Sequence, residues 1–311
     1  LPYIKNTVKL SEMHFDTNKS ILEPISHPLL DLHEVRLFIK RDDLIHPEVS
    51  GNKWRKLKYN LQQFEVMRNE SILTFGGAFS NHLLATASAC HQLKIPCIGV
   101  VRGEELNEQS NPLLAQCTKL GMKLHFVTRE EYTLRDMSEY FEELKTQFPN
   151  CYIIPEGGAN YYGMIGCQEI TKELPSYDHL FVAQGTATTS AGLLMGVKEG
   201  QILHAVPSIK GFDVVSELTK LYRKAGIDQE TIEELIRAMY IHSEAHFGGY
   251  AKVTEELIAF MSFCKEELKV KLDKVYTAKA FYALWEALKK GDLDHSTVVF
   301  LHTGGLGAHS E

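Results

Sequence analysis

Ser50-Gly51-Asn52-Lys53-Trp54-Arg55-Lys56-Leu57 places one lysine on a glycine turn at the predicted start of a helix. Ser50 and Asn52 are good helix-capping residues. Apolar or aromatic residues follow at roughly helical spacing, at Leu57, Tyr59, Leu61 and Phe64. The pattern therefore predicts Lys53 in the first turn of a helix.

Lys53 is the candidate reactive residue. The positive end of the helix dipole disfavours an ammonium there, and Arg55 and Lys56 add like charge, so we expect a lowered pKa for Lys53. A neutral amine is what Schiff-base chemistry needs. A second interpretation also fits this stretch, in which its basic residues form the solvated face of a surface helix: Lys53, Arg55, Lys56 and Lys58.

Composition places the chain among ordinary globular proteins. Its 311 residues are 44% hydrophobic and 23% charged, and the length favours about two domains. The formal net charge of -7 argues against a nucleic-acid partner. No apolar run approaches the roughly 18 residues of a membrane span, and the first residues lack a signal pattern, so we expect no membrane partner and a cytoplasmic location. Six cysteines without C-x-x-C pairing and fourteen histidines without H-E-x-x-H spacing predict no metal site.

The first half of the chain predicts a parallel sheet. Residues 1–34 are expected to be irregular, and residues 35–40 alternate as a strand. A short apolar strand at 72–75 runs into Gly76-Gly77-Ala78-Phe79-Ser80-Asn81-His82, and an alanine-rich helix follows to residue 93. Strand, glycine loop and helix in this order make the βα unit of a parallel sheet.

The pattern repeats up to a turn cluster at 155–160. Strands are predicted at 96–101, 123–127 and 152–154, and helices at 112–120 and 130–147. We therefore predict an α/β fold of two domains, each a mostly parallel sheet flanked by helices. Residues 1–55 and 160–311 would form the large domain, and residues 56–159 a small mobile domain that closes on a ligand between them.

A second glycine loop follows the strand predicted at 179–183. Its sequence is Gln184-Gly185-Thr186-Ala187-Thr188-Thr189-Ser190-Ala191-Gly192. Glycine and four hydroxyl side chains at the carboxyl end of a strand suit a phosphate, which free N–H groups and the helix dipole would bind. The lysine of a Walker loop and the G-x-G-x-x-G pattern are both missing, so a nucleotide is poorly supported. A capped helix after a core strand is the alternative.

The remaining segments place three hydroxyl residues in or beside turns. Helices are predicted at 216–225, at 231–239 with a near-capping-box start, and from 275 onward, and a strand at 297–302. Tyr250 ends a glycine turn, Tyr276 opens the helix at 275, and Thr303 follows the last strand. Each alone also fits a surface or packing residue; only the set is suggestive.

Five separated motifs together resemble one family. They are S-G-N-K-x-R-K at 50–56, G-G-x-x-S-N-H at 76–82, G-T-x-T-T-x-A-G at 185–192, V-Y-T-x-K at 275–279 and H-T-G-G at 302–305. In this order they resemble the 1-aminocyclopropane-1-carboxylate deaminase and D-cysteine desulfhydrase family. These are pyridoxal-phosphate enzymes of the tryptophan-synthase β-subunit fold, also called fold type II. The resemblance extends from about residue 35 onward.

The resemblance implies cofactor-binding roles. Lys53 would link covalently to pyridoxal 5'-phosphate, and Asn81 would hydrogen-bond the pyridoxal hydroxyl. Thr303 would be the partner of the ring nitrogen. The phosphate would bind the loop already singled out by its chemistry, at Gly185, Thr186, Ala187, Thr188 and Thr189.

The resemblance also implies a substrate side. Ser80 would face the substrate, and the backbone N–H groups of Ser80, Asn81 and His82 would bind its carboxylate. Tyr250 and Tyr276 would line the same side of the ring, and Thr277 would also belong to the substrate-binding residues. Lys53, Ser80, Tyr250 and Tyr276 are therefore the predicted catalytic residues, and a homodimer is the assembly that the resemblance implies.

Two positions divide the family. Cyclopropane-opening deaminases have a glutamate after the second tyrosine, where this chain has Thr277, as the desulfhydrases do, and His82 replaces the glutamine typical of the deaminases. The main hypothesis is β-elimination on a small amino acid, D-cysteine first, giving pyruvate, ammonia and sulfide. The alternatives are deamination of 1-aminocyclopropane-1-carboxylate to 2-oxobutanoate, a pyridoxal-phosphate-binding protein without turnover, or a binding module for another anion.

Overall fold

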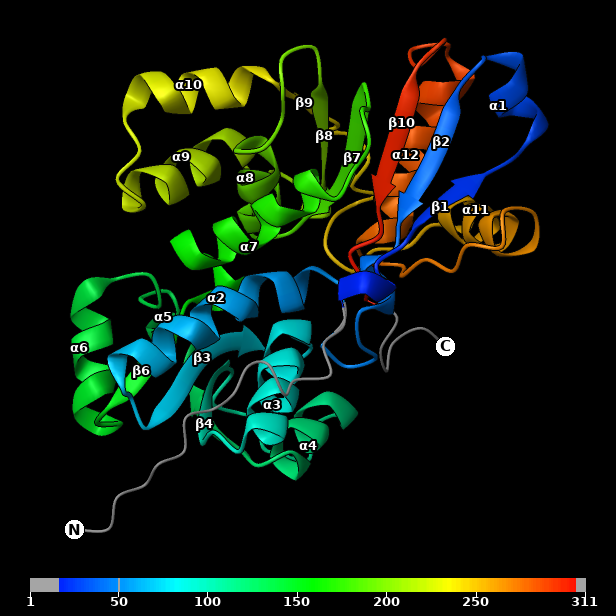
Figure 1. The fold of residues 1–311 in the computed structure, drawn as a ribbon. Coiled ribbons are helices and arrows are strands. Elements are labelled where there is room, and N and C mark those ends of the chain that lie inside the picture. The colour runs from blue at the N-terminus through cyan, green and yellow to red at the C-terminus, as the bar shows by residue number, and fades with distance from the viewer. Residues whose placement is uncertain (1–16, 50, 306–311) are drawn as a thin grey trace.

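Two β-sheets, each with helices packed on it, organise the computed structural model, which describes residues 17–49 and 51–305 (Figure 1). Ser50 and the first part of the segment expected to be irregular lie outside the described residues. Six strands form one sheet and four form the other, and nearly all neighbouring strands are parallel. The predicted α/β class with two mostly parallel sheets is confirmed.

The larger sheet has the strand order β1-β2-β10-β7-β8-β9. Only β1 runs antiparallel to its neighbour β2. In the centre, Phe300 of β10 lies opposite Ile39 of β2 and Phe181 of β7. The strands are β1 Leu22–Ile25, β2 Arg36–Lys40, β7 His179–Gln184, β8 Ile202–Pro207, β9 Met239–Ile241 and β10 Thr297–Leu301.

Helices cover both faces of this sheet because its central strands are apolar on both sides. Phe181 packs with one buried cluster, while its neighbours Leu180 and Val182 pack with the other, as the alternation of a strand requires. The first face carries α1 Pro28–Leu32, α11 Glu255–Glu266 and α12 Thr277–Lys289. The second carries α7 Tyr161–Lys172, α8 Thr188–Leu194, α9 Val214–Lys224 and α10 Gln229–Arg237.

The smaller sheet is fully parallel, in the order β5-β4-β3-β6. Ile72 faces one buried cluster and Leu73 the other. Its strands are β3 Ser71–Gly77, β4 Cys97–Arg102, β5 Met122–Val127 and β6 Cys151–Ile154. Its helices are α2 Asn52–Met67, α3 Asn81–Leu93 and α4 Pro112–Lys119 on one face, and α5 Arg129–Tyr132 and α6 Ser138–Gln147 on the other.

Several element predictions need correction. The segment before residue 35 is not irregular throughout, since β1 pairs with β2 and α1 follows it. The helix predicted at 130–147 is two helices, because the extended backbone of Met137 interrupts it. Helix α10 begins earlier than predicted, since the Asp228 carboxylate accepts a hydrogen bond from the Thr231 N–H and no capping box at Thr231 forms. Short 3-10 helices lie at Thr17–Lys19, Asp42–Leu44 and Glu156–Gly158.

Helix α2 joins the two sheets. It packs on the smaller sheet and also against α7, and the two helices lie side by side where the two halves of the molecule meet (Figure 1). A side chain at Gly166 of α7 would overlap the carbonyl oxygen of Arg55, so only glycine permits this approach. The loops after the carboxyl ends of β3, β7 and β10 carry Ser80, Gly185 and Thr303, as expected for parallel sheets. The domain boundaries near residues 55 and 160 stay a prediction.

Candidate functional site

The residue before α2 packs against the segment that follows the central strand β10. Gly51 has a φ of 62° and its α-carbon lies so close to the Thr303 carbonyl that a β-carbon would overlap it. Glycine is therefore required at this turn. The turn holds the start of α2, with Lys53 two residues after Gly51, against the segment that carries Thr303.

Asn52 connects Lys53 to the predicted phosphate loop. The Lys53 Nζ donates to Asn52 Oδ1 at 2.7 Å, and Asn52 Nδ2 donates to Thr189 Oγ1 at 2.8 Å. Asn52 and Thr189 are buried, so both hydrogen bonds lie in a protected environment. The lysine and the loop, 136 residues apart in sequence (53 to 189), therefore form one site.

The pKa of Lys53 is lowered to about 7, chiefly by burial and next by the like charge of Lys56. The predicted lowering of the Lys53 pKa is confirmed, but its main cause is burial and not the charge of Arg55. Arg55 does not crowd the amine, because its guanidinium points to Asp42 (2.9 Å) and Glu173 (2.8 Å). At neutral pH a large share of the Lys53 amine is free of its proton, which is the form that attacks a carbonyl.

The surface-helix interpretation of this stretch is wrong. Arg55 is 0% exposed and Lys56 is 4% exposed. The Arg55 guanidinium is compensated by two carboxylates, and Glu173 also binds Lys40 at 2.8 Å. This buried network anchors α2 to the segments before and after it, and a network with every charge paired is the arrangement that burial demands.

Lys56 is the residue that sequence reasoning missed. Among the described residues no carboxylate pairs with its ammonium, and burial lowers its pKa. Gly158 packs on it, since a β-carbon there would lie 2.9 Å from the Lys56 Cβ, and one at Gly157 would lie 2.7 Å from Thr186. A buried cation without an anion, beside the hydroxyl-rich loop, fits a phosphate. Its spacing of three residues from Lys53, on the same helix face, was the signal available in the sequence.

The phosphate loop between β7 and α8 has a special backbone. Ala187 lies in the left-handed region with a φ of 59°, and the Thr186 and Thr188 hydroxyls are 3.1 Å apart. Gly185 faces Tyr276, because a β-carbon there would lie 3.3 Å from the tyrosine ring. The loop thus lies against Gly157 on one side, next to the glycine that packs on Lys56, and against the start of α12 on another.

The glycine loop after β3 leads into α3 as predicted. Ser80 is the N-cap of α3, and its Oγ accepts a hydrogen bond from the Leu83 N–H at 3.4 Å. Asn81 is the first helical residue and is partly exposed. The backbone N–H groups at this helix start remain the predicted site for a carboxylate.

His82 turns its ring inward. Its Nε2 lies 2.9 Å from Thr74 Oγ1, while its buried Nδ1 has no partner in the described part of the chain. Burial, followed by the charges of Lys53 and Lys56, lowers its pKa to about 3, so the ring is neutral. Any contact of His82 with a substrate carboxylate would therefore come from its backbone N–H, as predicted.

Tyr250 and Tyr276 lie together. Their ring centroids are 6.2 Å apart at 67°, in an edge-to-face arrangement. Tyr276 is largely buried, which raises its pKa well above the usual value, and the nearby Tyr250 adds to this effect. Tyr250 is 48% exposed. The pair therefore places the Tyr276 ring beside Gly185 and the Tyr250 ring against Tyr276.

Thr277 requires a correction. The prediction made it a substrate-binding residue, but its side chain is 0% exposed and its Oγ1 donates to Asp273 Oδ2 at 2.6 Å. The hydroxyl also accepts from the Asp273 N–H at 2.8 Å. Thr277 therefore supports the start of α12 and does not face a substrate directly.

Asp273 is the partner that the sequence did not single out. Its carboxylate accepts hydrogen bonds from the Val275, Tyr276 and Thr277 N–H groups at 2.8 to 2.9 Å, as well as from the Thr277 hydroxyl. It also raises the pKa of Lys53 slightly, against the larger effect of burial. These contacts use the hydrogen-bonding capacity of the Asp273 carboxylate within the turn before α12.

Sequence comparison identifies the family of this chain. A family model described as pyridoxal-phosphate dependent enzyme matches residues 23–304. The chain belongs to this family. It is thus a pyridoxal-phosphate-dependent enzyme, and the buried Lys56 together with the Thr186–Thr189 hydroxyls fits the phosphate of that cofactor.

Individual relatives narrow the family further. A putative 1-aminocyclopropane-1-carboxylate deaminase of Pyrococcus abyssi is 33% identical over 88% of this chain and 85% of its own length. The mitochondrial bifunctional D-cysteine desulfhydrase/1-aminocyclopropane-1-carboxylate deaminase of Arabidopsis thaliana is 29% identical over 87% of this chain and 72% of its own length. The chain is therefore a member of the 1-aminocyclopropane-1-carboxylate deaminase and D-cysteine desulfhydrase group, and the resemblance seen in the motifs is confirmed.

Solved structures agree with this assignment. The crystal structure of an ACC deaminase homologue has a TM-score of 0.76 at 28% identity and covers 93% of this chain and 90% of its own. Serine racemase from Dictyostelium discoideum, at 17% identity and a TM-score of 0.63 over 92% of each chain, shares the fold alone. The pyridoxal-phosphate enzyme fold type II predicted from the motifs is confirmed.

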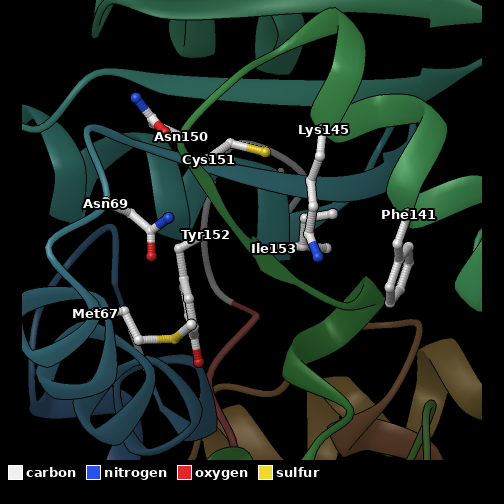
Figure 2. A pocket seen from close by; sticks show the side chains of 8 residues that line it. All are labelled: Met67, Asn69, Phe141, Lys145, Asn150, Cys151, Tyr152 and Ile153. Atoms are coloured by element: carbon white, nitrogen blue, oxygen red, sulfur yellow. The ribbon is translucent and has the colours of Figure 1, made fainter.

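A surface hollow of about 430 Å³ lies away from this site (Figure 2). It begins at Met67, the last residue of α2, roughly 20 Å along the helix from Lys53. Its lining is Met67, Asn69, Phe141, Lys145, Asn150, Cys151, Tyr152 and Ile153. It therefore belongs to the amino-terminal end of β6 and not to the predicted site.

No helix of residues 17–49 or 51–305 has the length and apolar character of a membrane span.

Proposed function

We propose that this pyridoxal-phosphate enzyme catalyses α,β-elimination on a small amino acid, with D-cysteine as the substrate, and releases pyruvate, ammonia and sulfide. One observation carries the choice of reaction: the start of α12 offers the cofactor ring no free carboxylate. Thr277 is buried and neutral, and Asp273 is occupied by four hydrogen bonds from the same turn.

The residues of the chain have distinct roles in this proposal. Pyridoxal phosphate, when bound, supplies the electron sink for the bond that breaks at the α-carbon. The Lys53 amine, with its pKa of about 7, is a base of suitable strength to take the α-proton near neutral pH. Asn81 would contact the pyridoxal hydroxyl, and Thr303, at the end of β10 beside Gly51, is the proposed neutral partner of the ring nitrogen.

The substrate would be held between the helix α3 start and the two tyrosines. Backbone N–H groups at Ser80, Asn81 and His82 would bind its carboxylate, where the helix dipole favours an anion. Tyr250 and Tyr276 would line the opposite side and limit the size of the β-substituent. This arrangement supports a small substrate whose thiol leaves from the β-carbon.

A second candidate is deamination of 1-aminocyclopropane-1-carboxylate to 2-oxobutanoate. It is favoured by the names of archaeal relatives such as the Pyrococcus abyssi protein. Ring opening has no α-proton to remove and needs a stronger electron sink, which a protonated ring nitrogen beside a carboxylate provides. The neutral Thr277 therefore favours elimination over ring opening.

Product analysis tests the choice. The purified protein, loaded with cofactor, is incubated with D-cysteine, L-cysteine, β-chloro-D-alanine and 1-aminocyclopropane-1-carboxylate, and pyruvate, 2-oxobutanoate and sulfide are measured. We expect pyruvate from the D-amino acids. Production of 2-oxobutanoate from the cyclopropane substrate at a rate equal to or above pyruvate formation from D-cysteine would refute the argument from Thr277.

Two variants and one control variant test the remaining alternatives. Lys53→Ala should abolish keto-acid formation and leave the fold intact, whereas Lys58→Ala is the matched control, because Lys58 lies on the same helix and pairs with Glu169 at 2.8 Å. A visible cofactor band in the parent protein without any keto acid would support a pyridoxal-phosphate-binding protein without turnover. Thr277→Glu should raise ring opening relative to elimination.

The assembly and domain motion also belong to the proposal. We place the mobile small domain at residues 56–159 and the large domain at residues 1–55 and 160–311, with closure on the substrate. We also propose that the protein is a homodimer and is located in the cytoplasm. Light scattering of the purified protein tests the dimer, and small-angle scattering with and without a bound substrate analogue tests the closure.

A further inference from the structure

Lys279 is a buried cation outside the roles assigned so far. It lies in the first turn of α12, within the V-Y-T-x-K motif, and its side chain is 0% exposed. Its Nζ donates to three backbone carbonyls: Gly249 at 2.7 Å, His246 at 2.8 Å and Ser208 at 3.4 Å. Within the described part of the chain no carboxylate forms an ion pair with this ammonium. A lysine that is surrounded by carbonyls in this way resembles a bound monovalent cation.

The three carbonyls come from two segments that are distant in sequence. Ser208 follows β8, and His246 and Gly249 belong to the glycine turn that ends at Tyr250. That turn needs its glycines, since Gly248 and Gly249 have φ values of 91° and 120°. Within the turn, the Gly248 and Gly249 N–H groups bond to His246, and Phe247 packs edge-to-face on Tyr282 of α12. The Lys279 ammonium adds the hydrogen bonds that tie the His246 and Gly249 carbonyls to α12.

The same ammonium links the two segments that carry the tyrosines of the site. Tyr250 is the residue after Gly249, and Tyr276 precedes Lys279 by three residues at the cap of α12. The edge-to-face contact of the two rings therefore depends on how the turn 246–250 is held against α12. A hydrogen bond from an ammonium to a carbonyl is stronger than one between two neutral groups. The turn 246–250 is therefore held firmly to α12 while Lys279 is protonated.

We infer that the Lys279 ammonium is a built-in cation that fixes the turn 246–250 to α12 and β8 and thereby positions Tyr250 against Tyr276. Lys279 is a positioning residue and does not touch the substrate. The inference rests on the proposed function only in placing the two tyrosines on the substrate side. The Ser208 hydroxyl is buried without a hydrogen-bond partner in the described residues, and it is a further polar group beside the same cage.

The geometry predicts chemical rescue by a small cation. Lys279→Ala would leave three carbonyls around an empty space, where K⁺ or NH₄⁺ can bind at the distances that the ammonium nitrogen now has. Lys279→Met removes the charge but fills the space with a side chain of similar length, so no ion can enter. Lys289→Ala is the matched control, because Lys289 lies at the exposed end of the same helix and pairs with Glu286.

Hydrogen exchange followed by mass spectrometry is the primary measurement, on the cofactor-loaded protein. We expect exchange in the peptide covering 246–250 to accelerate about tenfold or more in both Lys279 variants, with peptides of β10 and α2 unchanged. Adding 100 mM KCl or NH₄Cl should restore protection in Lys279→Ala but not in Lys279→Met, and LiCl should restore less. Unchanged exchange in both variants, or equal recovery with all three salts in both, would overturn the inference.

Steady-state kinetics give a second readout. Misplacing Tyr250 should raise KM about tenfold and change kcat less, and K⁺ should lower KM in Lys279→Ala alone. If the parent enzyme turns over none of the amino acids, the proposed function fails, while the exchange and rescue measurements still decide the role of Lys279. If Lys279→Met does not fold, the Lys279→Ala protein prepared in KCl and transferred to LiCl carries the test.

Discussion

The lowered pKa of Lys53 can be measured directly through its reaction with an aldehyde. Burial and the charge of Lys56 bring the pKa from 10.5 to about 7. At pH 7 about half of the amine is then neutral, whereas roughly one part in 3,000 would be neutral at the ordinary pKa. The rate of covalent attachment to Lys53 should therefore rise with pH up to about 7 and level off above it.

The assay uses apoenzyme and pyridoxal. Pyridoxal lacks the phosphate, so the proposed phosphate contacts of Lys56 and the loop do not enter the result. The product is reduced with borohydride at timed intervals, and the labelled lysine is located by mass spectrometry. Lys53→Arg controls for other lysines, and Lys58, on the same helix but paired with Glu169, should label slowly across the neutral range.

A second variant tests the cause of the shift. Lys56→Met removes the like charge and keeps most of the side-chain volume, so the inflection should move upward, but remain below 10.5 because burial is the larger effect. An inflection near 10 in the parent protein would refute the reasoning about Lys53. An unchanged inflection in Lys56→Met would refute the assigned influence of Lys56.

Three further predictions follow from the site and the core. Thr189→Val should weaken cofactor affinity about tenfold or more, since a buried hydrogen bond to a charged group contributes roughly 1.5–3 kcal/mol, and an unchanged Kd in a fluorescence titration would contradict this. Arg55→Met leaves the buried Asp42 carboxylate without its guanidinium and should lower the free energy of unfolding by about 3–5 kcal/mol in urea titrations; a loss below about 1 kcal/mol would count against the network. Burial lowers the pKa of His204 to about 3 and that of His242 to about 4, so the unfolded chain binds protons that the folded chain does not. Stability should fall as the pH drops from about 6.5 towards 4, and His204→Gln should flatten that slope, which thermal melts at several pH values will reveal.

The sequence by itself determined the local units of this protein. Strand, glycine loop and helix around Ser80 and around Gly185 were readable because each motif is a continuous stretch whose residues act on one another. The direction of the Lys53 pKa shift was predictable because Lys56 is a near neighbour in sequence, whereas burial, the larger cause, comes from the tertiary structure. The family motifs added the cofactor, which the comparison with known proteins confirmed.

Only the tertiary structure decided which distant groups meet. The sequence leaves Thr277 available for a substrate, but its hydroxyl is bound by Asp273. Lys56 and Lys279 stand out only in the structure, because both are buried and neither pairs with a carboxylate of residues 17–49 or 51–305. Strand β10, the last in sequence, lies between β2 and β7, so the Thr303 segment touches Gly51. Burial and hydrogen-bond partners depend on contacts between segments 30 to more than 200 residues apart. Local sequence patterns do not indicate which distant segments come into contact.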